Sequence, residues 1–413
     1  MIKQTNDKNI ILNRLLLSLG ILIFIRIGTF LPVPAINHSH LAFYLERHSM
    51  TKSLVSTFSG NDTFVIGLFT LNIFPYINAS ILIQVLISLF PSLSKLQKEG
   101  GGEGRRSINK LTRIITLGWA LIQSVSIAFY LKRALFDWNL YLAAEIIIWL
   151  TTGAMIVLWL SEIITEYGLG NGASLLIYTN IISNLPNFVK NLFINVSQVS
   201  ILSWLAIGVL FFVAISGIIL LQESTRIVPL ISSKQLNQTR QLISTGSQSN
   251  SNYLPLRFNQ AGVMPIILTT SFLVLPNYLI NLGIFQSLNF LTDFKWIYWI
   301  GYFVLILAFS SFYSSIVLNP KDISDQLQKS AVKIPGVRPG VQTIFYLKQE
   351  IQRITLMGAT LLAFITIVPN FIESTLNITS LSGLSTTSFL ILGGVILDLK
   401  REISNIYYSE IYR

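Results

Sequence analysis

The segment from residue 58 to residue 86 reads FSGNDTFVIGLFTLNIFPYINASILIQVL, and it decides the fold. Its first part is a mildly apolar stretch with two glycines, and its second part is a long apolar run around Pro75. Proline is well tolerated in the first turn of a helix, where its missing N–H is not needed. The local pattern predicts either a short half-helix or a surface loop, followed by a helix long enough to cross a bilayer.

The composition of the whole chain also points to a membrane. Of the 413 residues, 52% are apolar and only 11% are charged, and the mean hydropathy is +0.62. A soluble globular protein has about 25% charged residues. Because the apolar stretches are continuous rather than alternating, they predict membrane-spanning helices rather than the strands of a barrel.

Apolar stretches of spanning length recur along the chain, since about 20 mainly apolar residues are needed to cross the hydrocarbon. We expect ten transmembrane helices, at residues 14–33, 72–90, 111–131, 141–163, 172–193, 200–222, 262–282, 296–318, 352–371 and 386–399. An even number of spans places both termini on one side. The segments on that side hold 22 of the 29 basic residues, so the positive-inside rule makes it the cytoplasmic or stromal side.

Two of the inside segments are long, residues 223–261 and residues 319–351. Both lack a periodic pattern of their own, and residues 241–252 (QLISTGSQSNSN) have the composition of a solvated connector. The run IPGVRPG at 334–340 differs, because two prolines and two glycines surround Arg338. That run predicts a rigid tip that presents a cation.

Glycine-rich stretches give no sign of a cofactor site. Residues 100–104 (GGGEG) lack the Lys-Ser/Thr pair of a phosphate-binding loop, and we expect a flexible basic loop there. Residues 168–172 (GLGNG) lack the spacing of a dinucleotide site and predict a tight turn between two spans. The chain has no cysteine, and its three histidines share one loop, where isolated histidines are favoured over a metal site. We expect no catalytic residue, cofactor or metal.

Five stretches together resemble the SecY family of protein translocase channel subunits. Residues 58–86 are similar to the plug and second helix of that family, whose pattern is F-S-G followed by G-x-x-P-Y-I-x-A-S-I. The other four follow in the family's order: KEGGGEGRRSINKLTR at 98–113, ITEYGLGNGASLLI at 164–177, LPLRFNQAGVMPIIL at 254–268 and IPGVRPGVQT at 334–343. The resemblance implies a SecY-like, all-α membrane protein of ten transmembrane helices. These would form two pseudo-symmetric five-helix halves, residues 1–193 and 194–413, around an hourglass pore.

The resemblance also implies which residues form the channel. An apolar pore ring would consist of six isoleucines: Ile77, Ile81, Ile177, Ile181, Ile267 and Ile391. Stiff β-branched side chains make a narrow constriction that dewets and resists ions, yet still closes around an extended peptide. A plug near residues 58–70 would seal the outer side, and its residues would include Phe58, Ser59, Gly60, Phe64 and Gly67.

Partners follow from the same resemblance, because the chain shows no ATPase motif of its own. Energy would come from the SecA motor or from a ribosome on the inside loops, and docking would use Arg338, Lys333, Arg240, Arg105 and Arg106. SecE would act as a clamp, and the resemblance leaves open a third small SecG-like subunit. Signal-bearing preproteins would pass through the pore, and their apolar segments would leave sideways into the lipid bilayer between spans two/three and seven/eight. No nucleic acid is expected to bind except ribosomal RNA.

An ion-coupled secondary transporter is the alternative, since ten helices can form two inverted repeats. A transporter site usually includes an ionisable group at the membrane midplane, whereas the constriction expected here is apolar. We therefore expect a protein-conducting channel rather than a transporter or an enzyme.

The sequence also bears on location. No small-residue cleavage site follows the first apolar stretch at residues 30–34 (FLPVP), and no Arg/Ser-rich transit segment precedes it. Ile, Asn, Ser and Lys are favoured over Val, Ala and Arg, which is typical of an AT-rich genome. These features predict a plastid-encoded algal protein of the thylakoid membrane with both termini in the stroma, and a bacterial inner membrane is the alternative.

Overall fold

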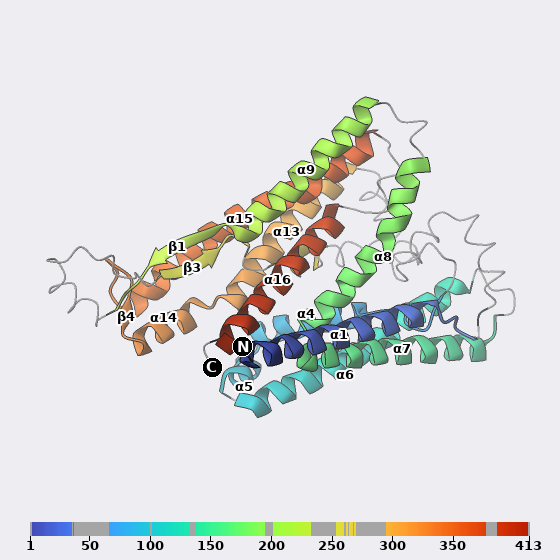
Figure 1. The fold of residues 1–413 in the computed structure, drawn as a ribbon, viewed down its shortest axis with the longest axis horizontal. Coiled ribbons are helices and arrows are strands. Elements are labelled where there is room, and N and C mark those ends of the chain that lie inside the picture. Colours follow the sequence, from blue (N-terminus) through green and yellow to red (C-terminus); the bar gives the residue numbers. More distant parts are fainter. Residues whose placement is uncertain are drawn as a thin grey trace. The chain divides into compact units, whose positions relative to one another are not determined.

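The computed structural model describes residues 2–34, 36, 66–99, 101–132, 138–194, 201–232, 253–259, 262, 264–266, 268–269, 295–376 and 386–411. Within these ranges most of the chain is helical (Figure 1). The chain divides into two compact units. The first unit comprises Met1–Gln198, Thr379–Leu384 and Val395–Arg413, and the second comprises Val199–Ile378 and Ser385–Gly394.

Long helices that pack side by side make up the first unit. They are α1 (Ile2–Phe30), α4 (Phe74–Leu89), α5 (Pro91–Glu99), α6 (Gly101–Leu131), α7 (Leu140–Tyr167), α8 (Gly172–Ile194) and the end of α16 (Thr386–Ile411). Helix α6 packs against α4 and α7, and α7 also contacts α1 and α8 (Figure 1). One apolar core includes Ile66, Leu71, Ala120, Ile146 and Leu150, all buried.

Helices and short strands alternate in the second unit. Its elements are α9 (Ile201–Glu223), β1 (Thr225–Pro229), β2 (Ile231–Ser232), β3 (Tyr253–Arg257), α13 (Lys295–Val317), α14 (Pro320–Lys329), β4 (Val332–Lys333), α15 (Val341–Leu376) and the start of α16. Helix α15 packs against α13 and α9 around a core that includes Ile218, Ile266, Tyr302, Ile306 and Leu362. Small polar side chains also join α13 to α15, because the hydroxyl oxygens of Ser314 and Thr355 lie 2.7 Å apart.

Within the described residues, nine of the ten expected spans overlap a long helix. Most of the remaining one, residues 262–282, lies outside those residues. Five described helices are long and apolar enough to cross a membrane by themselves, and a sixth span results if the bent pair Phe74–Ile87 and Pro91–Gln97 counts as one. The membrane-protein class is therefore confirmed, and the number ten stays a prediction.

The flexible loop expected at residues 100–104 is wrong, because the chain from Gly101 onward is helix α6. A φ of 51° at Gly101 marks the bend after α5, and α6 then packs back against α5. At Gly104 a side chain would collide with the backbone carbonyl of Leu96, so glycine permits the close approach. The glycines thus serve a helical hairpin rather than a flexible loop.

The two long inside segments also contain regular structure that the sequence did not predict. Strands β1 and β3 form an antiparallel ribbon in which Arg226 lies opposite Leu256 and Val228 lies opposite Leu254. Strands β2 and β4 form a second antiparallel pair, with Ile231 opposite Lys333. Residues 223–261 and 319–351 are therefore joined by strand pairing although about 100 residues separate them.

Candidate functional site

The structure describes five of the six expected ring isoleucines: Ile77, Ile81, Ile177, Ile181 and Ile391. The first two are one turn apart on α4 and the next two are one turn apart on α8, so each pair shares a helix face. Ile77 is buried and the other four are half-buried. Ile267 lies outside the described residues. A common depth for all six stays a prediction.

Asn72 sets the start of the helix that carries the first pair. Its φ of 47° lies in the left-handed region, at the position where the family pattern has glycine. Asparagine tolerates this region better than most residues. The buried side chain accepts a hydrogen bond through Oδ1 from the N–H of Ile73 at 2.9 Å. Helix α4 then begins at Phe74 with Pro75 in its first turn, as predicted.

Residues Ile66–Ile73, which we call the stem, connect the expected plug to α4. Backbone hydrogen bonds tie the stem to the chain after α1: the N–H of Val33 donates to Ile66 O at 3.1 Å, and the N–H of Leu68 donates to Leu31 O at 2.9 Å. Most of its side chains are buried. The stem is therefore held along its length by neighbouring elements of the first unit.

Three glycines allow the stem to approach its neighbours closely. A side chain at Gly67 would collide with the carbonyl of Thr29, and one at Gly153 of α7 would collide with the carbonyl of Leu68. Gly28 of α1 similarly leaves space for the ring of Phe69. Of the expected plug residues, only Gly67 is described, and it lies in the stem; Phe58, Ser59, Gly60 and Phe64 lie outside the described residues.

The turn predicted at residues 168–172 is present and connects four helices of the first unit. The N–H of Leu169 donates to the hydroxyl of Ser18 in α1 at 2.9 Å. The N–H of Gly170, whose φ is 86°, donates to a carboxylate oxygen of Glu402 in α16 at 3.1 Å. The N–H of Gly172 donates to the hydroxyl of Thr165 in α7 at 3.0 Å. Sequence reasoning found the turn but not Ser18 or Glu402.

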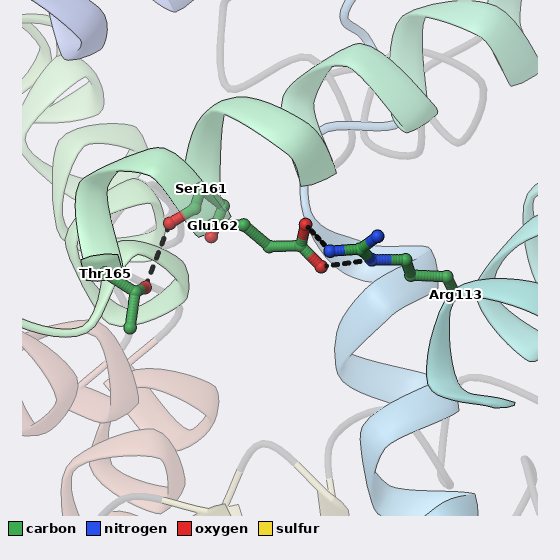
Figure 2. A network of polar contacts seen from close by, with 4 residues as sticks. All are labelled: Arg113, Ser161, Glu162 and Thr165. Atoms are coloured by element: carbon green, nitrogen blue, oxygen red, sulfur yellow. Dashed lines mark hydrogen bonds and ion pairs between the residues drawn. The ribbon is translucent and has the colours of Figure 1, made fainter. Parts of the chain in front are cut away.

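An ion pair joins Arg113 of α6 to Glu162 of α7 (Figure 2). Nε of Arg113 donates to Oε1 at 2.9 Å and Nη2 donates to Oε2 at 2.7 Å, so the contact is bidentate. One turn further along α7, Thr165 donates to the carbonyl of Ser161. Sequence reasoning did not single out Glu162, although opposite charges near the adjoining ends of two expected spans, residues 111–131 and 141–163, are a usable signal.

Arg338 lies at the tip that the sequence predicted. The chain turns twice around it, with φ values of 77° at Gly336 and 99° at Gly340, where glycine is favoured. The hydroxyl of Thr343 donates to the carbonyl of Arg338 at 2.9 Å, and Ile334 beside the turn is buried. The turn is thus anchored while the Arg338 side chain is exposed.

The other expected docking residues lie on separate elements. Lys333 is exposed in β4 and Arg106 is exposed in the early part of α6. Arg105 is also on α6, and Arg240 lies outside the described residues. Among the described residues, no cluster of three or more His, Asp or Glu side chains is arranged to hold a metal ion.

Comparison with known sequences gives a consistent result. Residues 67–400 match the family model described as SecY. The chain is 65% identical to a protein translocase subunit SecY of Trieres chinensis, over 99% of both chains. It is 42% identical to the subunit of Porphyra purpurea over 98% of both chains. It is also 39% identical to that of Synechococcus elongatus, over 97% of this chain and 93% of the relative.

Solved structures share the fold at low sequence identity. A SecY structure, described by its plug domain that stabilises the closed channel, has a TM-score of 0.67 at 16% identity and covers 96% of this chain and 92% of its own. A structure described as a protein conducting channel has a TM-score of 0.64 at 17% identity, with coverage of 96% and 93%. Sec61 in a canine ribosome-channel complex has a TM-score of 0.62 at 16% identity, again covering 96% and 93%.

Proposed function

The chain belongs to the SecY family, and from this premise we propose that it is the channel-forming subunit of a protein translocase that passes unfolded preproteins across a membrane. The observation that carries this conclusion is the 65% identity to a translocase subunit over 99% of both chains. The shared fold with a protein conducting channel agrees with it. The ion-coupled transporter is set aside, because the relatives are translocase subunits.

The constriction of the channel is the ring of six isoleucines expected from the sequence. Support comes from the pairing of Ile77 with Ile81 on one face of α4, and of Ile177 with Ile181 on one face of α8. Branched apolar side chains exclude water from a narrow pore and therefore oppose ion flow. The same side chains can separate around an extended peptide, since they make no bonds that must be broken.

A plug closes the outer side of this ring and is carried by the stem. The close packing of Gly28, Gly67 and Gly153 supports a fixed base in residues 66–73. The proposed plug, residues 58–70, overlaps this base at residues 66–70. The stem continues through Asn72 into helix α4, which carries Ile77.

Two pseudo-symmetric halves, residues 1–193 and 194–413, surround the pore. Apolar segments of a preprotein leave sideways into lipid between spans two/three and seven/eight. Polar segments continue through the pore, because burying their backbone and charges in hydrocarbon is unfavourable.

The partners act from the inside face. SecE clamps the two halves, a SecG-like subunit is a further candidate, and energy comes from SecA or a ribosome. The exposed Arg338 on an anchored turn supports docking of such a partner, as do the exposed Lys333 and Arg106. Arg105 and Arg240 complete the proposed docking residues. The channel itself is not an enzyme.

The protein is a multi-pass membrane protein, and we place it in the thylakoid membrane of an algal plastid with both termini in the stroma. Relatives from a diatom, a red alga and a cyanobacterium support this location. The excess of Lys and Arg in the segments that share the side of the termini supports the orientation.

Reconstitution tests the function. The chain would be purified with its small subunits, placed in vesicles, and supplied with SecA, ATP and a signal-bearing precursor. We expect protease-protected precursor inside the vesicles, and none with a precursor that lacks its signal. Saturable uptake of a small solute without any passage of precursor would instead favour the transporter.

A further inference from the structure

The two long inside segments build one body at the start of α15, which we call the platform. It consists of β1, β2, β3, α14, β4, the turn at residues 334–340 and the first turns of α15. Val228, Leu256, Ile334, Leu347, Ile351 and Ile354 form its buried core. Val337 packs against that core, so the turn that presents Arg338 rests on the same side chains as the ribbon of β1 and β3.

Arg226 lies on the face of the ribbon that packs against α15, although 49% of its side chain is exposed. Side chains alternate along a strand, so Arg226 shares a face with Val228 on β1, and their partners across the ribbon are Leu256 and Leu254. The opposite face carries Ile227 and is exposed. A cation on the side that faces α15 needs an anion there, and the sequence of α15 supplies one.

Glu350 is that anion. It lies one turn from Leu347 and Ile354 on the core-facing side of α15, and only 5% of its surface is exposed. Its Oε2 lies 2.9 Å from Nη1 of Arg226 but makes no hydrogen bond. Nη1 of Arg353 is 3.9 Å from Oε1. The attraction between Glu350 and Arg226 is therefore Coulombic rather than dependent on a bidentate fit.

We infer that Glu350 is a positioning residue for partner docking: its pair with Arg226 fixes the ribbon on α15 and thereby sets where the platform presents Lys333 and Arg338. The apolar contacts between the ribbon and α15 are non-directional. The ion pair adds a directional constraint, because a misplaced ribbon takes Arg226, the nearer cation at 2.9 Å, away from the buried Glu350 and leaves only Arg353 at 3.9 Å. Because β2 follows β1 along the chain and pairs with β4, the position of the ribbon also fixes the position of Lys333 in β4. This inference rests on the proposed docking of an inside partner.

The geometry of the platform can be measured directly, since the chain has no cysteine. Spin labels at Ile227→Cys on β1 and Phe345→Cys on α15 report the distance between ribbon and helix, and both sites are exposed, at 60% and 69%. Glu350→Gln and Arg226→Gln should each broaden the distance distribution. Arg226→Lys should keep it narrow, because a lysine preserves the Coulombic attraction. Arg353→Gln is the matched control, since this arginine is similarly exposed, at 59% against 49% for Arg226, but lies farther from Glu350, at 3.9 Å.

The functional arm measures translocation against SecA concentration in the reconstituted complex. If the ribbon is correctly seated only a fifth of the time, the half-saturating SecA concentration should rise about fivefold while the maximal rate is retained. The exchanged pair Arg226→Glu with Glu350→Arg should recover much of the loss. A lower maximal rate with an unchanged half-saturating concentration would overturn the inference, because Glu350 would then support the channel itself.

An unchanged distance distribution in both Gln variants would also overturn it. The distance measurement does not require translocation, so it still tests the inference if the proposed channel function is wrong.

Discussion

The hydroxyl of Ser18 in α1 accepts a hydrogen bond at 2.9 Å from the backbone N–H of Leu169, which lies 151 residues further along the chain. The same hydroxyl donates to the carbonyl of Arg14. A side chain at Gly168 would lie 2.5 Å from the Ser18 oxygen. One small residue in the first helix and one glycine in a distant turn therefore fit each other, and they fasten α1 to the connection between α7 and α8.

Ser18→Ala should destabilise the first unit by about 1–3 kcal/mol, because the N–H of Leu169 would be left buried without an acceptor. Thermal unfolding in detergent, followed by tryptophan fluorescence, checks this. Ser126→Ala is the control, since Ser126 bonds only to its own helix and is exposed. Equal melting temperatures for the two variants would contradict the importance of the Ser18 contact.

Arg113→Lys should weaken the link between α6 and α7, because a lysine cannot reproduce the two parallel bonds to Glu162. Both side chains are partly exposed, so the loss should be on the order of 0.5 kcal/mol and should shrink at high salt. Thermal unfolding at low and high salt measures it. A large loss that is independent of salt would mean that the pair is shielded from solvent.

Gly67→Ala and Gly153→Ala should each loosen the stem, because the added methyl group meets the carbonyl of Thr29 or of Leu68. Overpacking of this kind costs about 1–3 kcal/mol. We expect higher ion leak from vesicles that hold the resting channel. Gly118→Ala is the control, because nothing lies within 4 Å of that position. Leak as low as in the control would refute a sealing role for the stem.

Ile81→Asn and Ile391→Asn should hydrate the proposed ring, since a polar side chain removes the dewetting barrier. Ion conductance of the resting channel should rise, and precursors with weak signals should pass more readily. Ile81→Val keeps the branched apolar surface and should leave conductance low. Unaltered conductance in both Asn variants would place the constriction elsewhere.

Arg338→Lys should impair partner-driven import although it keeps the charge, because only a guanidinium makes a bidentate contact with a carboxylate or phosphate. Lys333→Arg serves as the matched exchange on the same platform and should import normally. Membrane insertion and SecE association are measured in parallel. Normal import by Arg338→Lys and by Arg338→Glu would exclude docking through this residue.

The helices of the membrane region could be predicted because continuous apolar length is a local signal. The start of α4 is an example, since Pro75 and the apolar run that follows it mark the helix without tertiary information. The turn at residues 168–172 was likewise predicted from its glycines. The helical residues 101–110 were missed because the first of them are polar and glycine-rich, and their packing depends on the close approach of Gly104 to the carbonyl of Leu96.

The platform was missed for a different reason. Strands β1 and β3 each contain a proline, Pro229 and Pro255, which argues against a strand when the partner is unknown. Their pairing bridges a polar stretch that shows no periodicity. The sequence analysis did not single out Glu350, because the packing that buries it on α15 and places it beside Arg226 of β1 is tertiary.

Helix α16 runs without a break from Thr386 to Ile411, yet its first residues belong to one compact unit and those from Val395 onward belong to the other. The crossing falls at Gly393 and Gly394, where the helix has no side chains to stiffen it and where bends occur most readily. One continuous helix therefore carries the chain from one compact unit into the other, and Gly393 and Gly394 are where that helix resists bending least.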